Sequence, residues 1–130
     1  MNKIFFAHQD PKITSLYEDS LVPYFTFDSA HDGLSAIRKI RLFQPDLIVS
    51  DYHLPLLSGL TILKYIRSHP TLYPIPFLFL TDHDDANTAL NFGANEWIDR
   101  RTIAPPDLIN RIFYHIKINQ PVSLHKLYGI

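Results

Sequence analysis

Two polar residues that follow buried apolar runs are the first candidates for chemistry. Asp51 comes just after the run 47–49, and Thr81 directly follows the run 77–80. Both runs have the length and the β-branched or aromatic content of a buried strand. An acidic side chain at the carboxyl end of a buried parallel strand lies where open α/β sheets place their ligand chemistry. The sequence therefore predicts a site built around Asp51.

Further polar residues follow the other expected strands. His8, Gln9 and Asp10 follow the first run, His53 shares the loop of Asp51, Asp82 and His83 follow Thr81, and Arg100 follows the last run. Loops are polar for solvation alone, so one such residue carries little weight. The pair Asp51 and Thr81 carries more, because each ends a strongly apolar run.

The elements that must position these residues alternate along the chain. We expect strands over 4–7, 24–27, 47–49, 77–80 and 96–98, and helices over 11–20, 34–43, 60–68, 86–92 and 107–118. Asp10 and Pro11 form a helix-start signal, and Gly93 is suited to end a helix. Such alternation predicts a parallel sheet covered on both faces. Five strands favour the flavodoxin-like α/β fold, a doubly wound three-layer sandwich with strand order 2-1-3-4-5.

Length and composition predict one soluble cytoplasmic domain. The chain has 130 residues, a net charge of −1 and no cysteine. We expect a domain over residues 1–118 and a tail over 119–130. The near-neutral charge argues against a nucleic-acid partner. No apolar stretch reaches the ~20 residues of a membrane helix, and the first apolar run is too short for a signal peptide.

Four separated segments resemble, in the same order, the response-regulator receiver family, also called CheY-like. They are Ala30-His31-Asp32-Gly33, the segment 45–59, the segment 75–81, and Gly93-Ala94-Asn95-Glu96-Trp97-Ile98. The likeness extends from residue 3 to about residue 118. It implies signal transduction in a two-component phosphorelay, in which a histidine kinase phosphorylates an aspartate. It implies no catalytic residues and no enzymatic activity of the chain's own.

The resemblance assigns roles to single positions. Asp51 matches the phospho-acceptor, Thr81 the switch hydroxyl, and Trp97 the aromatic residue that rearranges on activation. In the family, an acidic pair after the first strand and the acceptor hold Mg²⁺, which prefers oxygen ligands. Here the ligands that could remain are Asp10, Asp51 and the backbone carbonyl of His53. Asp10 is explained better as a helix cap.

Several positions depart from the family pattern. His8 and Gln9 stand at the acidic-pair positions, and Arg100 stands at the lysine position. Imidazole and amide are poor ligands for Mg²⁺, so we expect weak Mg²⁺ binding, slow or absent phosphorylation by small phosphodonors, and no other cofactor. Arg100 could pair with the unmodified Asp51 through two hydrogen bonds and hold one constitutive state.

Two functions follow from this mixture. In the first, the chain is a phosphorelay receiver in which Asp51 still accepts a phosphoryl group, with the partner supplying what the site lacks. In the second, it is a pseudo-receiver that binds partners without phosphorylation. The expected partners are a sensor histidine kinase or phosphotransfer protein, a downstream protein and a second copy of the chain, but neither nucleic acid nor membrane.

Two further hypotheses concern ligands. His8, His53 and His83 lie on loops that would meet near Asp51, and imidazole with carboxylate suits Zn²⁺, Ni²⁺ or Cu²⁺ better than Mg²⁺. A flavin phosphate would need Ser, Thr or Gly amides after the first strand. The segment His8-Gln9-Asp10-Pro11 has none of these residue types, so we set flavin binding aside.

Overall fold

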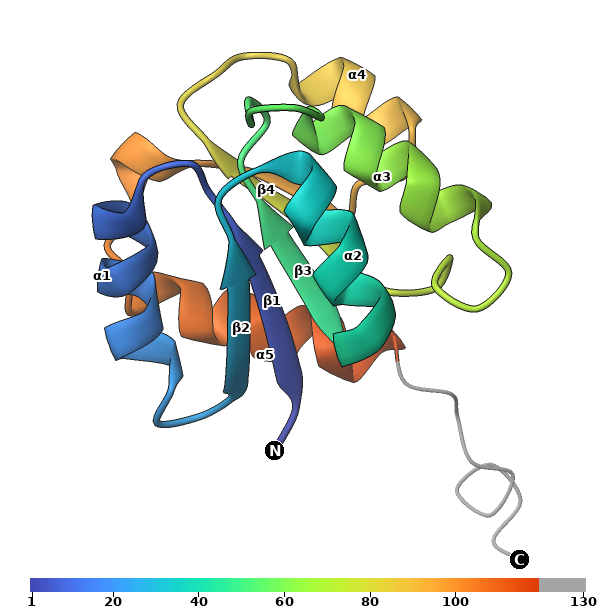
Figure 1. Ribbon diagram of the computed structural model, residues 1–130. Coiled ribbons are helices and arrows are strands. Elements are labelled where there is room, and N and C mark those ends of the chain that lie inside the picture. The colour runs from blue at the N-terminus through green and yellow to red at the C-terminus, as the bar shows by residue number, and fades with distance from the viewer. Residues whose placement is uncertain (120–130) are drawn as a thin grey trace, which may run out of the picture.

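A five-stranded parallel sheet lies between two layers of helices in the computed structural model, which describes residues 1–119 (Figure 1). The strands are β1 (Lys3–Ala7), β2 (Thr26–Ala30), β3 (Leu47–Ser50), β4 (Phe77–Thr81) and β5 (Glu96–Asp99). Their spatial order is β2-β1-β3-β4-β5, and every neighbouring pair is parallel. This is the flavodoxin-like fold that the sequence predicts.

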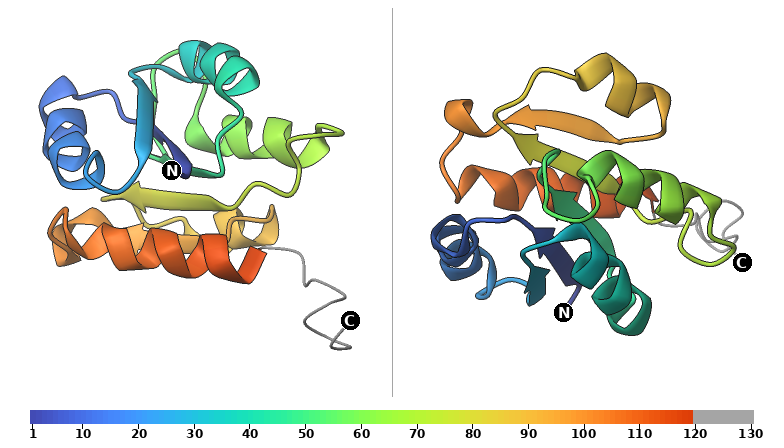
Figure 2. Two further views of the ribbon diagram at one scale, coloured as in Figure 1. Left: turned by 90° about the horizontal axis from the view of Figure 1, so that it is seen from below. Right: turned by 45° about the horizontal axis from the view of Figure 1, so that its top comes forward.

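Five α-helices cover the two faces of the sheet. They are α1 (Pro11–Leu21), α2 (Gly33–Phe43), α3 (Gly59–Ser68), α4 (Ala86–Asn91) and α5 (Asp107–Asn119), with a 3₁₀ helix η1 (Arg100–Thr102) after β5. Helices α1 and α5 pack on one face, and α2, α3 and α4 pack on the other (Figure 2). Within residues 1–119, no helix has the length and hydropathy needed to cross a bilayer.

The central strands β1, β3 and β4 are buried on both faces, which fixes the sheet between its two helical layers. Phe5, Ile48 and Phe79 point to the α2–α3 side, whereas Phe6 and Val49 point to the α1–α5 side. All five side chains are at most 1% exposed. Burial of each large apolar side chain contributes about 1.5–3 kcal/mol. Because successive residues alternate between the faces, a shift of one residue would exchange the two sets.

Helix ends follow the signals in the sequence. Asp10 caps α1, with its carboxylate accepting the Lys12 amide at 2.9 Å, and Pro11 is the first helical residue. Asp32 caps α2 in the same way through the Ser35 amide. A cap of this kind stabilises a helix by about 1 kcal/mol. The caps at Asp10 and Asp32 matter for the site, because both helices begin directly after strands at the same edge of the sheet.

The second strand lies later than expected. The prediction of a strand over 24–27 was wrong, since β2 begins at Thr26 and ends at Ala30. The amides of Tyr24 and Phe25 instead bond the carbonyl of Leu21 in a turn after α1. Phe25 is 2% exposed, so its apolar character reflects burial from a loop rather than from a strand. The short helix η1 was not expected either.

Arg67 ties α3 to two loops on the opposite side of the molecule from α1. Its guanidinium donates to the carbonyl oxygens of Gly93 (2.9 Å), Tyr73 (2.8 Å) and Ile75 (2.7 Å) and to Oδ1 of Asn95 (2.9 Å). Burial lowers the pKa of Arg67. Gly93 has φ +99°, and a Cβ there would lie 3.0 Å from Nε of Arg67. Glycine at this turn therefore meets both the backbone conformation and the close approach of Arg67.

Replacing Arg67 by Met should lower the free energy of unfolding by about 2–3 kcal/mol, because four oxygen acceptors lose their donor at once. Urea denaturation measures this change. Arg38→Met serves as the control, since Arg38 is exposed on α2 and its loss should change stability by less than about 0.5 kcal/mol. Equal stability of the two variants would contradict the role given to Arg67.

Candidate functional site

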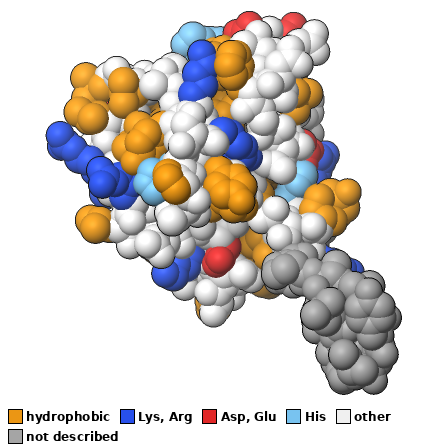
Figure 3. Space-filling view, turned by 90° about the vertical axis from the view of Figure 1, so that its right-hand side faces the viewer, with side chains coloured by type: hydrophobic (Ala, Val, Ile, Leu, Met, Phe, Trp, Pro, Cys, Tyr) orange, Lys and Arg blue, Asp and Glu red, His pale blue; other side chains and the backbone are white. Residues whose placement is uncertain are grey.

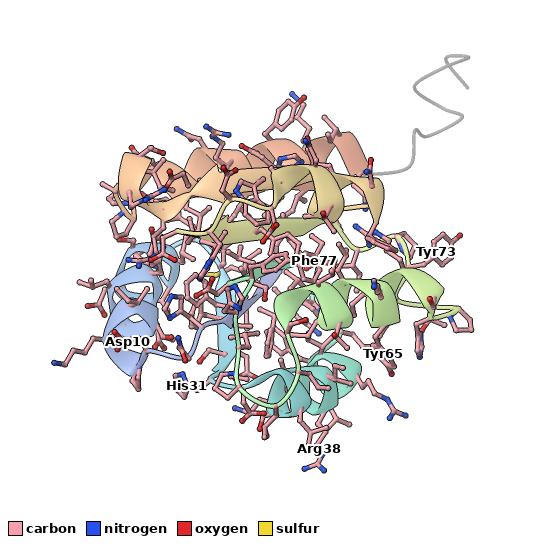
Figure 4. The ribbon with its side chains drawn as sticks, turned by 90° about the horizontal axis from the view of Figure 1, so that it is seen from above. Asp10, His31, Arg38, Tyr65, Tyr73 and Phe77 are labelled. Carbon is pink, nitrogen blue, oxygen red and sulfur yellow. The ribbon has the colours of Figure 1, made fainter. Side chains whose placement is uncertain are left out.

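The carboxyl ends of the strands meet at one edge of the sheet, and the polar residues gather there. Figure 4 looks down on this edge and shows Asp10 and His31 beside each other at the side nearest α1. Asp51 follows β3, Thr81 ends β4 and His8 follows β1. Because β1, β3 and β4 are neighbours in the sheet, these three side chains are brought together.

Asp51 is the centre of the site and is only 7% exposed. Its Oδ1 accepts the hydroxyl of Thr81 at 2.5 Å and the backbone amide of Tyr52 at 2.7 Å. Thr81 itself is completely buried. The proximity of Asp51 and Thr81, expected from their places after two apolar runs, is present in the structure. A buried carboxylate needs such donors, because an uncompensated charge would be costly to bury.

His8 lies against the other oxygen of Asp51. Its Nε2 is 3.2 Å from Oδ2, and the His8 side chain is 6% exposed. Its Nδ1 accepts the backbone amide of Asp10 at 3.0 Å. A neutral imidazole that accepts at Nδ1 carries its proton on Nε2, so an N–H group faces the carboxylate. The Nε2–H group of His8 makes no hydrogen bond to Oδ2 of Asp51, so the contact is a charge–dipole attraction.

Burial lowers the pKa of His8, and Asp51 opposes this shift by favouring the charged ring. Arg100 lowers the pKa of His8 further through charge repulsion. Since the net direction is below the ordinary value of 6.5, the ring is neutral at pH 7. The site thus holds its carboxylate with a neutral imidazole, a hydroxyl and an amide.

His31 is a member of the site that the sequence analysis missed. Its Nδ1 lies 2.9 Å from the carbonyl oxygen of His8, within hydrogen-bond distance. The strand register explains the contact, because Ala7 pairs with Ala30 and the next residues on both strands are therefore side by side. The sequence signal for this contact was the position of His31 directly after β2, the strand that neighbours β1.

Arg100 does not contact Asp51 in the structure of residues 1–119. The predicted pairing of these two side chains is therefore wrong. Its Nη2 lies 3.5 Å from Oδ2 of Asp82, and its buried Nε has no partner. The sheet order gives the reason. Arg100 follows β5 at the edge of the sheet, β5 neighbours β4, and Asp82 follows β4, whereas Asp51 lies one strand farther away.

The three histidines do not form a metal cluster. The rings of His53 and His83 are 3.8 Å apart, but Nε2 of His8 faces Asp51. Among residues 1–119, no group of three or more His, Cys, Asp or Glu side chains is arranged to hold a metal ion. The tautomer of His8 also opposes metal binding, because the ring nitrogen near Asp51 carries a proton rather than a free lone pair.

Trp97 is connected to the site through aromatic packing. Its ring is half-buried and lies 5.4 Å from the ring of Tyr52 and 5.3 Å from that of Phe79, measured between centroids. The amide of Tyr52 donates to Asp51. Asp51 and Trp97 are thus connected through one intervening residue, Tyr52.

Thr81→Val should destabilise the protein by about 1–3 kcal/mol, because it removes a buried donor to Asp51 while preserving the shape of the side chain. Thermal and urea unfolding measure the loss. Thr26→Val, at an exposed position of β2, should have little effect and serves as the control. Wild-type stability of Thr81→Val would show that the hydroxyl contributes nothing to holding Asp51.

Comparison with known proteins agrees with this geometry. The family model described as "Response regulator receiver domain" matches residues 4–113. The chain is 32% identical over 102 residues to "Transcriptional regulatory protein TrcR" of Mycobacterium tuberculosis, covering 75% of this chain and 39% of that protein. It is 27% identical over 112 residues to "Hybrid signal transduction histidine kinase D" of Dictyostelium discoideum, covering 84% of this chain and 7% of that protein. The chain thus spans less than half the length of these relatives.

Solved structures show the same fold. The receiver domain of Francisella response regulator 1452 superposes with a TM-score of 0.83 at 23% identity, covering 92% of this chain and all of that one. The beryllofluoride-activated receiver domain of Klebsiella pneumoniae RstA gives a TM-score of 0.79 at 27% identity, covering 89% and 99% of the two chains. The sheet order, the position of Asp51 and the match to the family model together show that this chain belongs to the response regulator receiver domain family of two-component signalling proteins.

Proposed function

We propose that this receiver domain is a pseudo-receiver, which transmits a signal by binding protein partners without phosphorylation of Asp51. The observation that carries the proposal is the Nε2–H group of His8, which lies 3.2 Å from Oδ2 of Asp51. Thr81 and the Tyr52 amide occupy Oδ1. Both oxygens of the carboxylate are therefore engaged by groups of the chain itself.

The residues at the site do not fit a magnesium ion. Mg²⁺ requires oxygen ligands in near-octahedral geometry. The carboxylate of Asp10 is used to cap α1, Gln9 is exposed, and Asp82 is paired with Arg100. An ion approaching Oδ2 of Asp51 would also meet the proton on His8. We propose that Mg²⁺ binds weakly here.

The switch residues support a state that does not depend on phosphorylation. The family resemblance assigns the hydroxyl of Thr81 to the phosphorylated form of the aspartate. In this chain the hydroxyl already bonds the unmodified Asp51, and Trp97 already packs against Tyr52. We propose that the surface presented to partners is set by folding alone and that the domain acts by binding rather than as an enzyme.

The partners that we propose are proteins of the signalling pathway. The relatives carry names of a hybrid signal transduction histidine kinase and a transcriptional regulatory protein. A sensor histidine kinase or phosphotransfer protein on one side, and a downstream protein or a second copy of the chain on the other, are consistent with those names.

A phosphorelay receiver is the second candidate, in which Asp51 accepts a phosphoryl group from the histidine of a partner. One observation favours it. Thr81 and Asp51 lie together at the ends of adjacent strands, as they would to hold a phosphorylated aspartate. In this case the partner has to supply the charge neutralisation that the site lacks, because phosphoryl transfer depends mostly on positioning and electrostatics.

Incubation with an autophosphorylated sensor histidine kinase or phosphotransfer protein, beside acetyl phosphate or beryllofluoride with Mg²⁺, distinguishes the two candidates, because the protein donor can supply what the site lacks. For a pseudo-receiver we expect no phosphoryl adduct by mass spectrometry and no change in Trp97 fluorescence. A response in the wild type that disappears in Asp51→Asn would contradict our proposal and establish the second candidate.

Introducing the acidic pair of the family pattern should produce a fluorescence response to beryllofluoride and Mg²⁺. We expect His8→Asp/Gln9→Asp to show Mg²⁺-dependent changes in Trp97 fluorescence with beryllofluoride, because it removes the N–H group from Asp51 and adds two oxygen ligands. Gln44→Asp/Ser68→Asp adds the same charge at the opposite end of the sheet and should remain silent. A silent acidic-pair variant that is folded would show that His8 and Gln9 are not what blocks the site.

A further inference from the structure

Helices α2 and α3 carry basic side chains and no acidic ones. The chain as a whole holds 12 basic and 13 acidic residues, and these two helices contain five of the basic ones: Arg38, Lys39, Arg41, Lys64 and Arg67. Figure 3 shows one side of the molecule, on which basic and apolar side chains are interspersed and acidic ones are few. A local excess of positive charge attracts a partner of opposite charge, even where the net charge of the chain is near zero.

Three of the five basic side chains are engaged within the domain itself. Nζ of Lys39 donates to the carbonyl oxygen of Ser29 at 2.8 Å. Nζ of Lys64 lies 4.3 Å from the centre of the Phe92 ring, over its face. Arg67 donates to the oxygen acceptors of two loops, as described above. These three positive charges therefore have structural partners.

Arg38 and Arg41 are the other two basic residues of this layer. Both are exposed, and neither forms an ion pair or a side-chain hydrogen bond within residues 1–119. Asp32, the acidic residue that precedes α2, is bonded to the amide and the hydroxyl of Ser35 instead. Figure 4 shows Arg38 pointing outward from α2, away from the sheet. Both guanidinium groups thus have all their donors available to a partner.

Leu34 and Leu42 accompany the two arginines on one continuous face of α2. At about 100° per residue, positions 41, 34, 38 and 42 follow one another around the helix within an arc of about 100°, and no other position of α2 falls inside that arc. Leu34 is 38% exposed and Leu42 is 89% exposed. Arg38, Arg41 and Leu42 also line a shared shallow hollow. We call these four residues the α2 face.

We propose that the α2 face binds an acidic helical segment of a partner protein. Arg38 and Arg41 are three residues apart and hence neighbours on the helix surface, so they match two carboxylates one turn apart on the partner. A guanidinium and a carboxylate can form two parallel hydrogen bonds. Leu34 and Leu42 would pack on apolar side chains beside those carboxylates.

This inference specifies a partner for the proposed function and rests on the domain acting through protein contacts. None of the four residues of the α2 face belongs to the Asp51 site. The α2 face would therefore bind its partner whether or not Asp51 accepts a phosphoryl group.

The apolar part of the α2 face is too small for a membrane partner. A helix that lies in a lipid interface buries a broad apolar face. The other large apolar residues of α2 point inward, since Ile40 is fully buried and Ile37 and Phe43 pack against the core. Only Leu34 and Leu42 remain on the outside of the helix, which fits a protein segment better than a lipid surface.

Fluorescence anisotropy with a labelled synthetic peptide tests the proposal. The peptide is a short helix with glutamates one turn apart and leucines beside them, and the comparison peptide has glutamine at each glutamate position. We expect the glutamate peptide to bind roughly tenfold more tightly, and Arg38→Gln/Arg41→Gln to abolish this preference, because two charge pairs are lost. Leu34→Ser/Leu42→Ser should weaken the binding of both peptides.

Lys12→Gln/Lys117→Gln is the matched control. It removes the same charge from exposed positions of α1 and α5, so it should bind both peptides like the wild type. Asp51→Asn should also bind like the wild type, which separates this test from the phosphorylation experiment. Circular dichroism checks that all variants are folded.

Two results would overturn the proposal. Equal binding of the glutamate peptide by the wild type and by Arg38→Gln/Arg41→Gln, or no binding by either, would show that the α2 face is not a site for acidic segments. Cosedimentation with phosphatidylserine vesicles that requires both arginines, without any binding of the peptide, would assign the face to a membrane instead. Neither result would bear on whether Asp51 is phosphorylated.

Discussion

The structure depends on how the buried carboxylate of Asp51 is compensated. Burying a charge is costly unless donors surround it. Three adjacent strands supply the compensating groups. The Tyr52 amide, which follows β3, and the Thr81 hydroxyl, which ends β4, donate hydrogen bonds, and the His8 ring, which follows β1, adds a charge–dipole attraction. No one of these groups carries a full charge at pH 7, given the lowered pKa of His8. The sheet therefore has to hold all three in register, and the apolar layers on both of its faces do so.

In our proposal, this arrangement lets a receiver fold keep its shape while its chemistry changes. The fold requires apolar strands, helix caps and short connections, all of which this chain has. Phosphoryl chemistry requires in addition a cluster of oxygen ligands and a free carboxylate oxygen. We propose that His8 removes both requirements, because it stands at an acidic position of the family pattern and places an N–H group against Asp51. The fold alone thus does not determine the reaction, and the site has to be examined residue by residue.

The sequence was sufficient to predict the sheet order and the meeting of Asp51 with Thr81, because both follow from apolar runs and from the common edge of parallel strands. It was not sufficient for contacts that depend on the exact path of the loops. The predicted partner of Arg100 was wrong, since its side chain meets Asp82 at the end of the neighbouring strand before it could reach Asp51 one strand farther away. The tautomer of His8 depends on the Asp10 amide, which no residue type reveals. The tail predicted from residue 119 lies outside the described residues, apart from Asn119 itself, the last residue of α5.

The hydrogen bonds of Arg67 have a consequence for how this sequence can vary. Three of its four acceptors are main-chain carbonyls, which every residue type provides. Substitutions at Tyr73 or Ile75 therefore leave those bonds available, whereas no change at either position can replace the guanidinium. Tolerance to mutation is thus divided unequally across this contact. The side chains of the two loops can vary without loss of these bonds. Arg67 and Gly93, which lie in close contact, cannot be replaced without disturbing them.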